Sequence, residues 1–173
     1  YLIKKMSLFY KFKFSIINKS FKTIIKLYDL IFDNIDKNIQ KFSIDGINFN
    51  NFKGDITKDI VWTWIINKEG LKLFTKFLQD IDLVNNLNQI YNNDFHILGI
   101  SFITVNKKEV LDVESEYHYD ILSQYDTVSK TNILTVLIPL KIEDGMGGLE
   151  YYLNNILYKC KYNIGEYYSF DSS

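Results

Sequence analysis

Residues 133–153 read ILTVLIPLKIEDGMGGLEYYL. The apolar run at 133–140 has the length of one buried strand and falls far short of the roughly 18 residues that a membrane span needs. The acidic turn after it leads into Gly145, Gly147 and Gly148, and glycines gathered in this way mark a change of chain direction. The stretch therefore predicts a strand, a turn and a second strand.

Strand-like segments continue on both sides of this stretch. Residues 95–105 (FHILGISFITV) alternate or run apolar in strand fashion. The segments LEYYL and ILYKCKY are predicted to form a β-hairpin that closes at Asn154 and Asn155, and EYYSF at 166–170 supplies one more strand. The second half of the chain is therefore predicted to be a set of antiparallel strands.

The first half is predicted to be mainly helical. An amphipathic helix, interrupted at most once, is expected over residues 17–42, and two shorter helices are expected over about 68–79 and 81–91. The first helix is indicated by apolar residues at every third or fourth position: Ile17, Phe21, Ile24, Tyr28, Ile31, Ile35, Ile39 and Phe42. Its apolar face is expected to pack on the domain core, with a membrane surface or a partner helix as the alternative.

Short strands and turns are predicted between the first two helices, at 43–65. The last of these strands carries Trp62 and Trp64, which are expected in the core or on a sheet face, with stacking against a substrate as the alternative. Helices followed by antiparallel strands predict an α+β fold with a sandwich or jelly-roll barrel. We expect one domain, with 1–92 as mainly helical support and 93–173 as the β core.

Composition and charge narrow the classes of partner. The chain has no Ala and no Arg, while Ile, Lys, Asn, Tyr, Phe and Asp are plentiful, a pattern that an AT-rich genome explains better than a function does. The formal net charge is -1 and the acidic residues are interleaved with the lysines, as on an ordinary solvated surface. A non-specific phosphate binder normally needs a basic excess, so nucleic acid is not an expected partner. No membrane span is expected either.

Few residues could carry catalysis. The sequence has no phosphate-binding or dinucleotide-binding glycine motif, no Cys-x-x-Cys, no His-Glu-x-x-His and no Gly-x-Ser-x-Gly. Its histidines are His96 and His118, so a site of three histidines cannot form within these residues. We expect His96 to be structural, because it precedes His118 and lies on the strand that enters the core.

The one cysteine, Cys160, excludes an internal disulfide and fits a reducing compartment such as the cytoplasm. It alternates with Ile156, Tyr158 and Tyr162 on one face of a predicted strand. We therefore expect a core thiol rather than a nucleophile.

His118-Tyr119-Asp120 is the strongest candidate for chemistry. In an extended strand, side chains two residues apart point to the same side, so the imidazole and the carboxylate can converge on one ion. An imidazole and a carboxylate are two thirds of the facial triad that holds non-haem Fe(II) and leaves positions open for a co-substrate and oxygen.

The order of segments around this motif resembles a known family. A His-x-Asp, a loop, an apolar strand, a Gly-Gly-Leu strand and a Gly-x-x-x-x-Phe strand follow one another between residues 95 and 173. This order resembles the double-stranded β-helix core of the Fe(II)/2-oxoglutarate-dependent oxygenases, in particular the prolyl-hydroxylase type. The resemblance implies a jelly-roll, cupin-like barrel with N-terminal helices packed against it.

The resemblance also assigns roles to residues. It implies that His118 and Asp120 are the first two iron ligands, that Gly147 and Gly148 open the strand behind the site, and that Gly165 begins the strand that leads to the third ligand. That ligand, a histidine, and the basic residue that anchors 2-oxoglutarate would both lie beyond Ser173, so the barrel is expected to be incomplete. The 173 residues alone are then expected to be inactive or to bind metal weakly.

The activity implied is hydroxylation of a C–H bond by a dioxygenase that uses Fe(II), 2-oxoglutarate and molecular oxygen. The prolyl-hydroxylase likeness favours a protein or peptide side chain such as proline or lysine as substrate, with a small molecule as the alternative. The loop at 121–130 would border the mouth of the site. Two other classes stay open: a non-catalytic jelly-roll module with a structural or binding role, and another cupin-like metal enzyme.

Overall fold

The computed structural model of the chain describes residues 9–53, 60–92, 95, 97, 99–105, 134–144, 148–153 and 156–171. The chain divides into two compact units. The central unit is Ser15–Asp112, and the terminal unit combines Tyr1–Phe14 with Val113–Ser173. The expectation of one domain over 1–173 stays a prediction, since compact units can belong to one domain.

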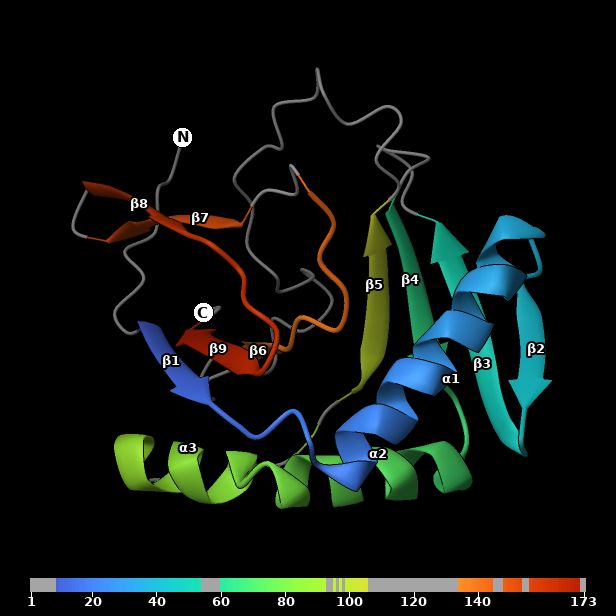
Figure 1. Cartoon of the computed structure of the whole chain (residues 1–173), viewed down its shortest axis with the longest axis horizontal. Coiled ribbons are helices and arrows are strands. Elements are labelled where there is room, and N and C mark those ends of the chain that lie inside the picture. The colour runs from blue at the N-terminus through green and yellow to red at the C-terminus, as the bar shows by residue number, and fades with distance from the viewer. Residues whose placement is uncertain are drawn as a thin grey trace, which may run out of the picture. The chain divides into compact units, whose positions relative to one another are not determined.

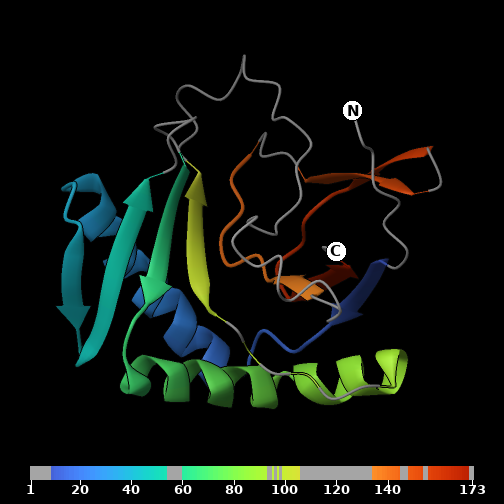
Figure 2. The same ribbon diagram turned by 180° about the vertical axis from the view of Figure 1, so that it is seen from behind.

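The central unit is a four-stranded antiparallel sheet with helices on one face. The sheet order is β2-β3-β4-β5, and each strand pairs with the next one along the chain. Helix α1 crosses one face of this sheet (Figure 1), and the view from behind turns the opposite face toward the reader (Figure 2). The described elements are α1 (Lys19–Asp36), β2 (Lys41–Ile44), β3 (Ile47–Lys53), β4 (Ile60–Ile65), α2 (Lys68–Asp80), α3 (Leu83–Tyr91) and β5 (Ser101–Val105).

The core of this unit lies between the sheet and the helices. Phe49 of β3 is fully buried, and its ring contacts those of Phe42 and Phe102. Phe102 in turn meets the ring of Phe74 from α2 edge-on at 5.2 Å. Of the predicted apolar face of α1, Phe21, Ile24 and Ile31 are buried, together with Leu27, whereas Ile17 precedes the helix and is 76% exposed. The alternation of β3 and β4 thus turns every second side chain toward the helices.

The predicted helices α2 and α3 are confirmed, but α1 ends earlier than expected. Asn38 takes a left-handed conformation with φ 56°, and the N–H of Ile39 donates to the carbonyl of Asn34. These are the marks of a Schellman cap, which stops the helix. The prediction that Phe42 continues the helix is therefore wrong, because Phe42 lies in β2, which turns into β3 at Asp45 and Gly46. Both turn residues have positive φ, as a two-residue hairpin requires.

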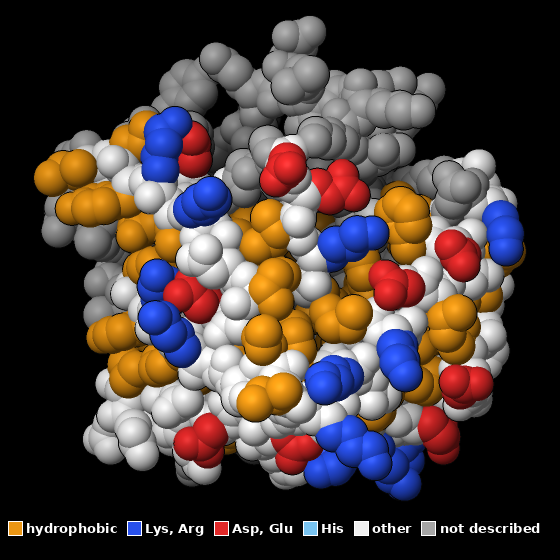
Figure 3. All heavy atoms as spheres, in the orientation of Figure 1, with side chains coloured by type: hydrophobic (Ala, Val, Ile, Leu, Met, Phe, Trp, Pro, Cys, Tyr) orange, Lys and Arg blue, Asp and Glu red, His pale blue; other side chains and the backbone are white. Residues whose placement is uncertain are grey.

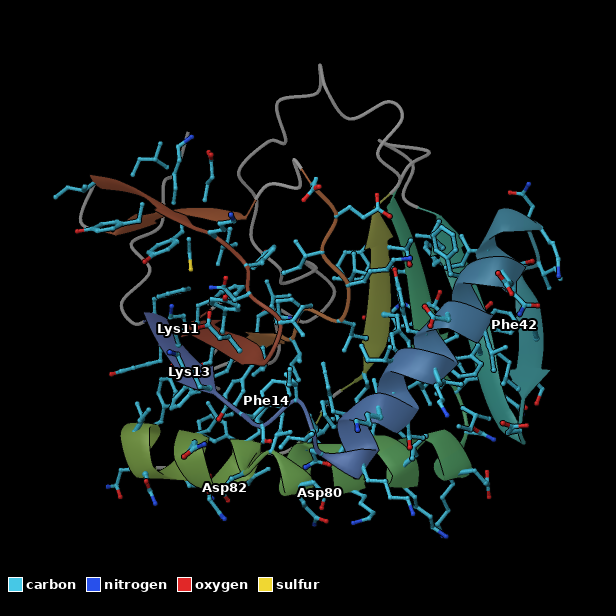
Figure 4. All side chains as sticks on the ribbon, in the orientation of Figure 1. Lys11, Lys13, Phe14, Phe42, Asp80 and Asp82 are labelled. Carbon is cyan, nitrogen blue, oxygen red and sulfur yellow. The ribbon has the colours of Figure 1, made fainter. Side chains whose placement is uncertain are left out.

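Polar contacts join the start of α1 to the end of α2 (Figure 4). The Ser20 hydroxyl donates a hydrogen bond to the Asp80 carboxylate, and the Asn18 side chain donates to the Asp80 carbonyl at 3.1 Å. The hydrogen bond from Ser20, followed by the contact with Lys76, lowers the pKa of Asp80 below its ordinary value. Elsewhere on these helices lysines and carboxylates are interleaved (Figure 3), as predicted for a solvated surface.

The terminal unit contains a three-stranded antiparallel sheet, in the order β1-β9-β6, and a separate two-stranded hairpin of β7 and β8. The predicted hairpin and the strand at EYYSF are confirmed. The predicted strand at 133–140 is shorter, because Pro139 lacks the N–H that a strand would donate. The elements are β1 (Phe9–Lys13), β6 (Leu134–Leu137), β7 (Leu149–Leu153), β8 (Ile156–Cys160) and β9 (Glu166–Asp171).

Among the described residues, the predicted α+β class is confirmed, without the barrel. The described residues form antiparallel sheets and helices, and they do not form a closed barrel. In the part of the chain that the structure describes, no helix is long and apolar enough to cross a membrane.

Candidate functional site

The residues predicted to bind iron, His118 and Asp120, lie outside the described residues, as do Gly147 and the other histidine, His96. Within the described ranges, no three His, Cys, Asp or Glu side chains come together in a group that could hold a metal ion. His118 and Asp120 therefore stay predicted ligands. Of the strands that the resemblance places around the iron, the structure describes those that follow these two residues in the chain, β6 to β9.

Two of the predicted structural glycines are described. Gly148 directly precedes β7, and a Cβ at this position would overlap the carbonyl oxygen of Cys160 in β8. Only a residue without a side chain fits here, so Gly148 sets the close approach of the two hairpin strands. Gly165 directly precedes β9 with φ 83°, and its carbonyl accepts a 2.8 Å hydrogen bond from the N–H of Phe14.

A carboxylate that the sequence did not single out lies at the start of β9. Glu166 is 6% exposed and accepts hydrogen bonds from the Asn163 amide and the Tyr168 hydroxyl, both at 2.8 Å. Lys11 of the neighbouring strand β1 forms an ion pair with it at 3.5 Å (Figure 4). The hydrogen bond from Asn163, aided by Tyr168 and Lys11 and opposed by burial, lowers the pKa of Glu166.

Tyr168 completes this polar cluster. It is fully buried, its hydroxyl accepts from the N–H of Asn163 at 3.0 Å, and burial together with the bond to Glu166 raises its pKa to about 12. The groups satisfy one another, so the cluster fastens β9 in place and offers no open position for a reaction. A charged residue at the start of an otherwise aromatic strand was the signal in the sequence that could have revealed it.

The prediction of a core thiol at Cys160 is wrong in part. Cys160 is half-buried, while Ile156 and Tyr158 on the same strand are 57% and 39% exposed. Burial raises the pKa of the Cys160 thiol, which disfavours the reactive thiolate form. Hydrophobic side chains gather over the hairpin (Figure 3), so β7 and β8 present apolar surface instead of enclosing it.

The tryptophans lie on a sheet face, which is one of the two locations predicted from the sequence. Val61, Thr63 and Ile65 of β4 point toward the helices, so Trp62 and Trp64 occupy the opposite face, where Trp64 is 40% exposed.

No family model matches the chain, and no curated protein or solved structure is significantly similar to it.

Proposed function

We propose that this chain carries part of the fold and two of the iron ligands, His118 and Asp120, of a non-haem Fe(II)/2-oxoglutarate-dependent dioxygenase. The proposed enzyme hydroxylates a C–H bond, with a prolyl or lysyl side chain of a protein or peptide as the substrate class. The observation that best supports the proposal is the pairing order in the terminal unit. Strands β6 and β9 pair with each other, and the β7–β8 hairpin lies between them in the sequence. Such a nested arrangement is what half of a jelly roll requires.

The ligand types and the glycines agree with this proposal. An imidazole from His118 and a carboxylate from Asp120 are the donors that suit Fe(II), and both precede the nested strands in the chain. When bound, Fe(II) supplies oxygen activation coupled to the decarboxylation of 2-oxoglutarate. The work of the chain would be to hold the two donors in place and to shape the pocket wall, where Gly148 lets β7 and β8 approach each other.

The experiment measures succinate formed from 2-oxoglutarate by the complete gene product, with and without Fe(II) and with prolyl and lysyl peptides. We expect succinate to depend on Fe(II) and to fall to background in Asp120→Ala, because this variant lacks one iron ligand. Asp126→Ala, a change in the same region of sequence, is the control and should keep the activity. Because Asp126 lies in the loop expected at the mouth of the site, Asp29→Ala, at an exposed position of α1, is measured beside it as the control outside that loop. Unchanged succinate formation in Asp120→Ala contradicts the proposal.

A second candidate is a non-catalytic jelly-roll module with a structural or binding role. The exposed apolar side chains of β8, Ile156, Leu157 and Tyr158, favour it, because contiguous exposed apolar surface often marks an interface. This module would lack Fe(II)-dependent succinate formation, and the double substitution Ile156→Ser and Tyr158→Ser would abolish its self-association in sedimentation.

A further inference from the structure

The sheet of the central unit has an aromatic face that the helices leave uncovered (Figure 2). It is defined by Phe52 of β3, Trp62 and Trp64 of β4, and Ile103 of β5. Phe52 is 62% exposed, and Trp64 and Ile103 are each 40% exposed. Pairing aligns Phe52, Trp62 and Ile103 in one row across three strands. The aromatic face is thus a contiguous apolar surface and not a set of scattered side chains.

The rings on this face are held in place. The Trp62 and Trp64 rings are nearly parallel, with an interplanar angle of 13° and centroids 6.4 Å apart. The Trp64 ring rests against Gly99, where an added Cβ would come within 2.8 Å of it. A ring that packs on backbone loses little conformational freedom when a ligand stacks on it.

The polar groups around these rings indicate the chemistry of a ligand. Asn50 lies beside Trp64, and its side-chain oxygen is buried without a hydrogen-bond partner in the described part of the chain. A buried acceptor without a donor costs free energy, so a ligand that displaces the groups covering this oxygen and offers an N–H or O–H group would gain a hydrogen bond. Lys41 pairs with Asn50 from β2 and is exposed on the same face. Among the described positions of this face there is no carboxylate, and its remaining polar residues are Ser43, Asn48 and Ser101.

We infer that the aromatic face binds unpaired bases of a single-stranded nucleic acid. The nucleic-acid strand would offer flat base rings to Trp64 and Phe52, base N–H donors to Asn50 and a backbone phosphate to Lys41. One common class of RNA-binding module uses aromatic side chains on a four-stranded sheet to stack unpaired bases in this manner. Single-strand binding normally combines a positively charged groove with aromatic stacking, and here the rings of the aromatic face would carry most of the binding while Lys41 supplies a cation for one phosphate. The inference does not rest on the proposed iron site.

The chain carries its own reporter, because its two tryptophans, Trp62 and Trp64, both lie on this face. The experiment titrates the whole chain with a single-stranded oligonucleotide of mixed, non-self-complementary sequence and records tryptophan fluorescence. We expect saturable quenching. The duplex of the same sequence should quench far less, because its bases are stacked inside the helix, and a neutral oligosaccharide should not quench.

Variants separate stacking from charge. Trp64→Ala, which keeps Trp62 as reporter, and Phe52→Ala should each weaken binding roughly 5- to 150-fold, the range of one base–aromatic stack. Trp64→Phe keeps a ring and should retain most of the affinity, which guards against a folding artefact. Phe32→Ala, on α1 and 43% exposed in the native chain, is the matched control and should bind normally. Lys41→Gln should lower the salt dependence of log affinity by roughly 0.7, because the variant neutralises one phosphate fewer.

Three results overturn the inference. The first is an absence of quenching by the single strand at any concentration reached. The second is binding that Trp64→Ala and Phe52→Ala leave unchanged, since the strand would then bind elsewhere. The third is quenching by the oligosaccharide but not by the oligonucleotide, which would assign the aromatic face to carbohydrate.

Discussion

The two units differ in how far apart in the sequence their pairing partners lie. In the central unit every strand pairs with the next one along the chain. In the terminal unit β1 pairs with β9 from the other end of the chain, with Phe9 opposite Phe170. Local patterns of apolar residues report on neighbours, and they carry no information on which distant segment closes a sheet. This difference explains why the sequence did not indicate that β1 closes the sheet of the terminal unit.

The units also differ in what their cores contain. The central unit buries mainly Phe and aliphatic side chains between helices and a sheet, with a smaller set of buried polar residues, Ser20, Asn51, Thr63 and Thr104. The terminal unit buries Tyr167, Tyr168 and Ser169 in β9, next to the carboxylate of Glu166. Hydrophobic packing should therefore dominate the stability of the central unit, and close backbone contacts and polar groups should matter more in the terminal unit.

The largest effect is expected from a matched pair on β3. Phe49→Ala removes a fully buried ring between Phe42 and Phe102 and should lower the free energy of unfolding by about 3–5 kcal/mol. Phe52→Ala, three residues on but 62% exposed, should change it by about 0.5 kcal/mol or less. Urea denaturation measures both. Equal losses of stability would show that the two faces of this sheet are not different environments.

An intermediate effect is expected in the β7–β8 hairpin. Gly148→Ala places a methyl group onto the carbonyl oxygen of Cys160, so the backbone must shift, at a cost of about 1–3 kcal/mol. Ile156→Ala, on the same hairpin and 57% exposed, is the control and should have little effect. If thermal unfolding shows no loss of stability in Gly148→Ala, the two strands do not pack as described.

A pH-dependent effect is expected from Tyr168→Phe. The pKa of Glu166 is lowered in the folded chain. The contribution of its carboxylate to folding stability is therefore fully present above the ordinary pKa and is lost as the pH falls through the lowered value. Removing the Tyr168 hydroxyl takes away one bond that lowers this pKa, so the loss of stability on acidification, which begins near the ordinary pKa in both chains, should be smaller and should end at higher pH in Tyr168→Phe. At neutral pH the change should cost about 1–2 kcal/mol.

The measurement is the urea midpoint as a function of pH, with Tyr158→Phe as the control on the exposed hairpin. If the urea midpoint falls on acidification in the same way in Tyr168→Phe as in the native chain, the polar cluster does not set the acid stability of the terminal unit.

The sequence predicted most elements but not their connections or all of their ends. Helices α2 and α3 and the β7–β8 hairpin follow from periodicity and turn residues, and they are confirmed. Ile39 and Phe42 continue the helical spacing of α1, yet the cap at Asn38 stops the helix, and no apolar period signals a cap. Strand β1 was missed because its partner, β9, lies at the other end of the chain.

For the candidate site, the sequence predicted the types of ligand but not their arrangement in space. His118 and Asp120 follow from their ligand types and spacing, and their geometry lies outside the described residues. Glu166 was missed because its importance depends on Lys11, Asn163 and Tyr168, which only the fold brings to it. The exposure of Trp64 likewise depends on which face of the sheet the helices cover.

The most direct test of the iron site compares the two histidines of the chain. Fe(II) affinity is measured anaerobically by calorimetry for the complete gene product in its native form and as His118→Ala and His96→Ala. We predict that His118→Ala weakens Fe(II) binding by at least roughly tenfold, because the imidazole ligand is removed, whereas His96→Ala leaves it unchanged. Equal affinities in the native chain and in His118→Ala would contradict the account.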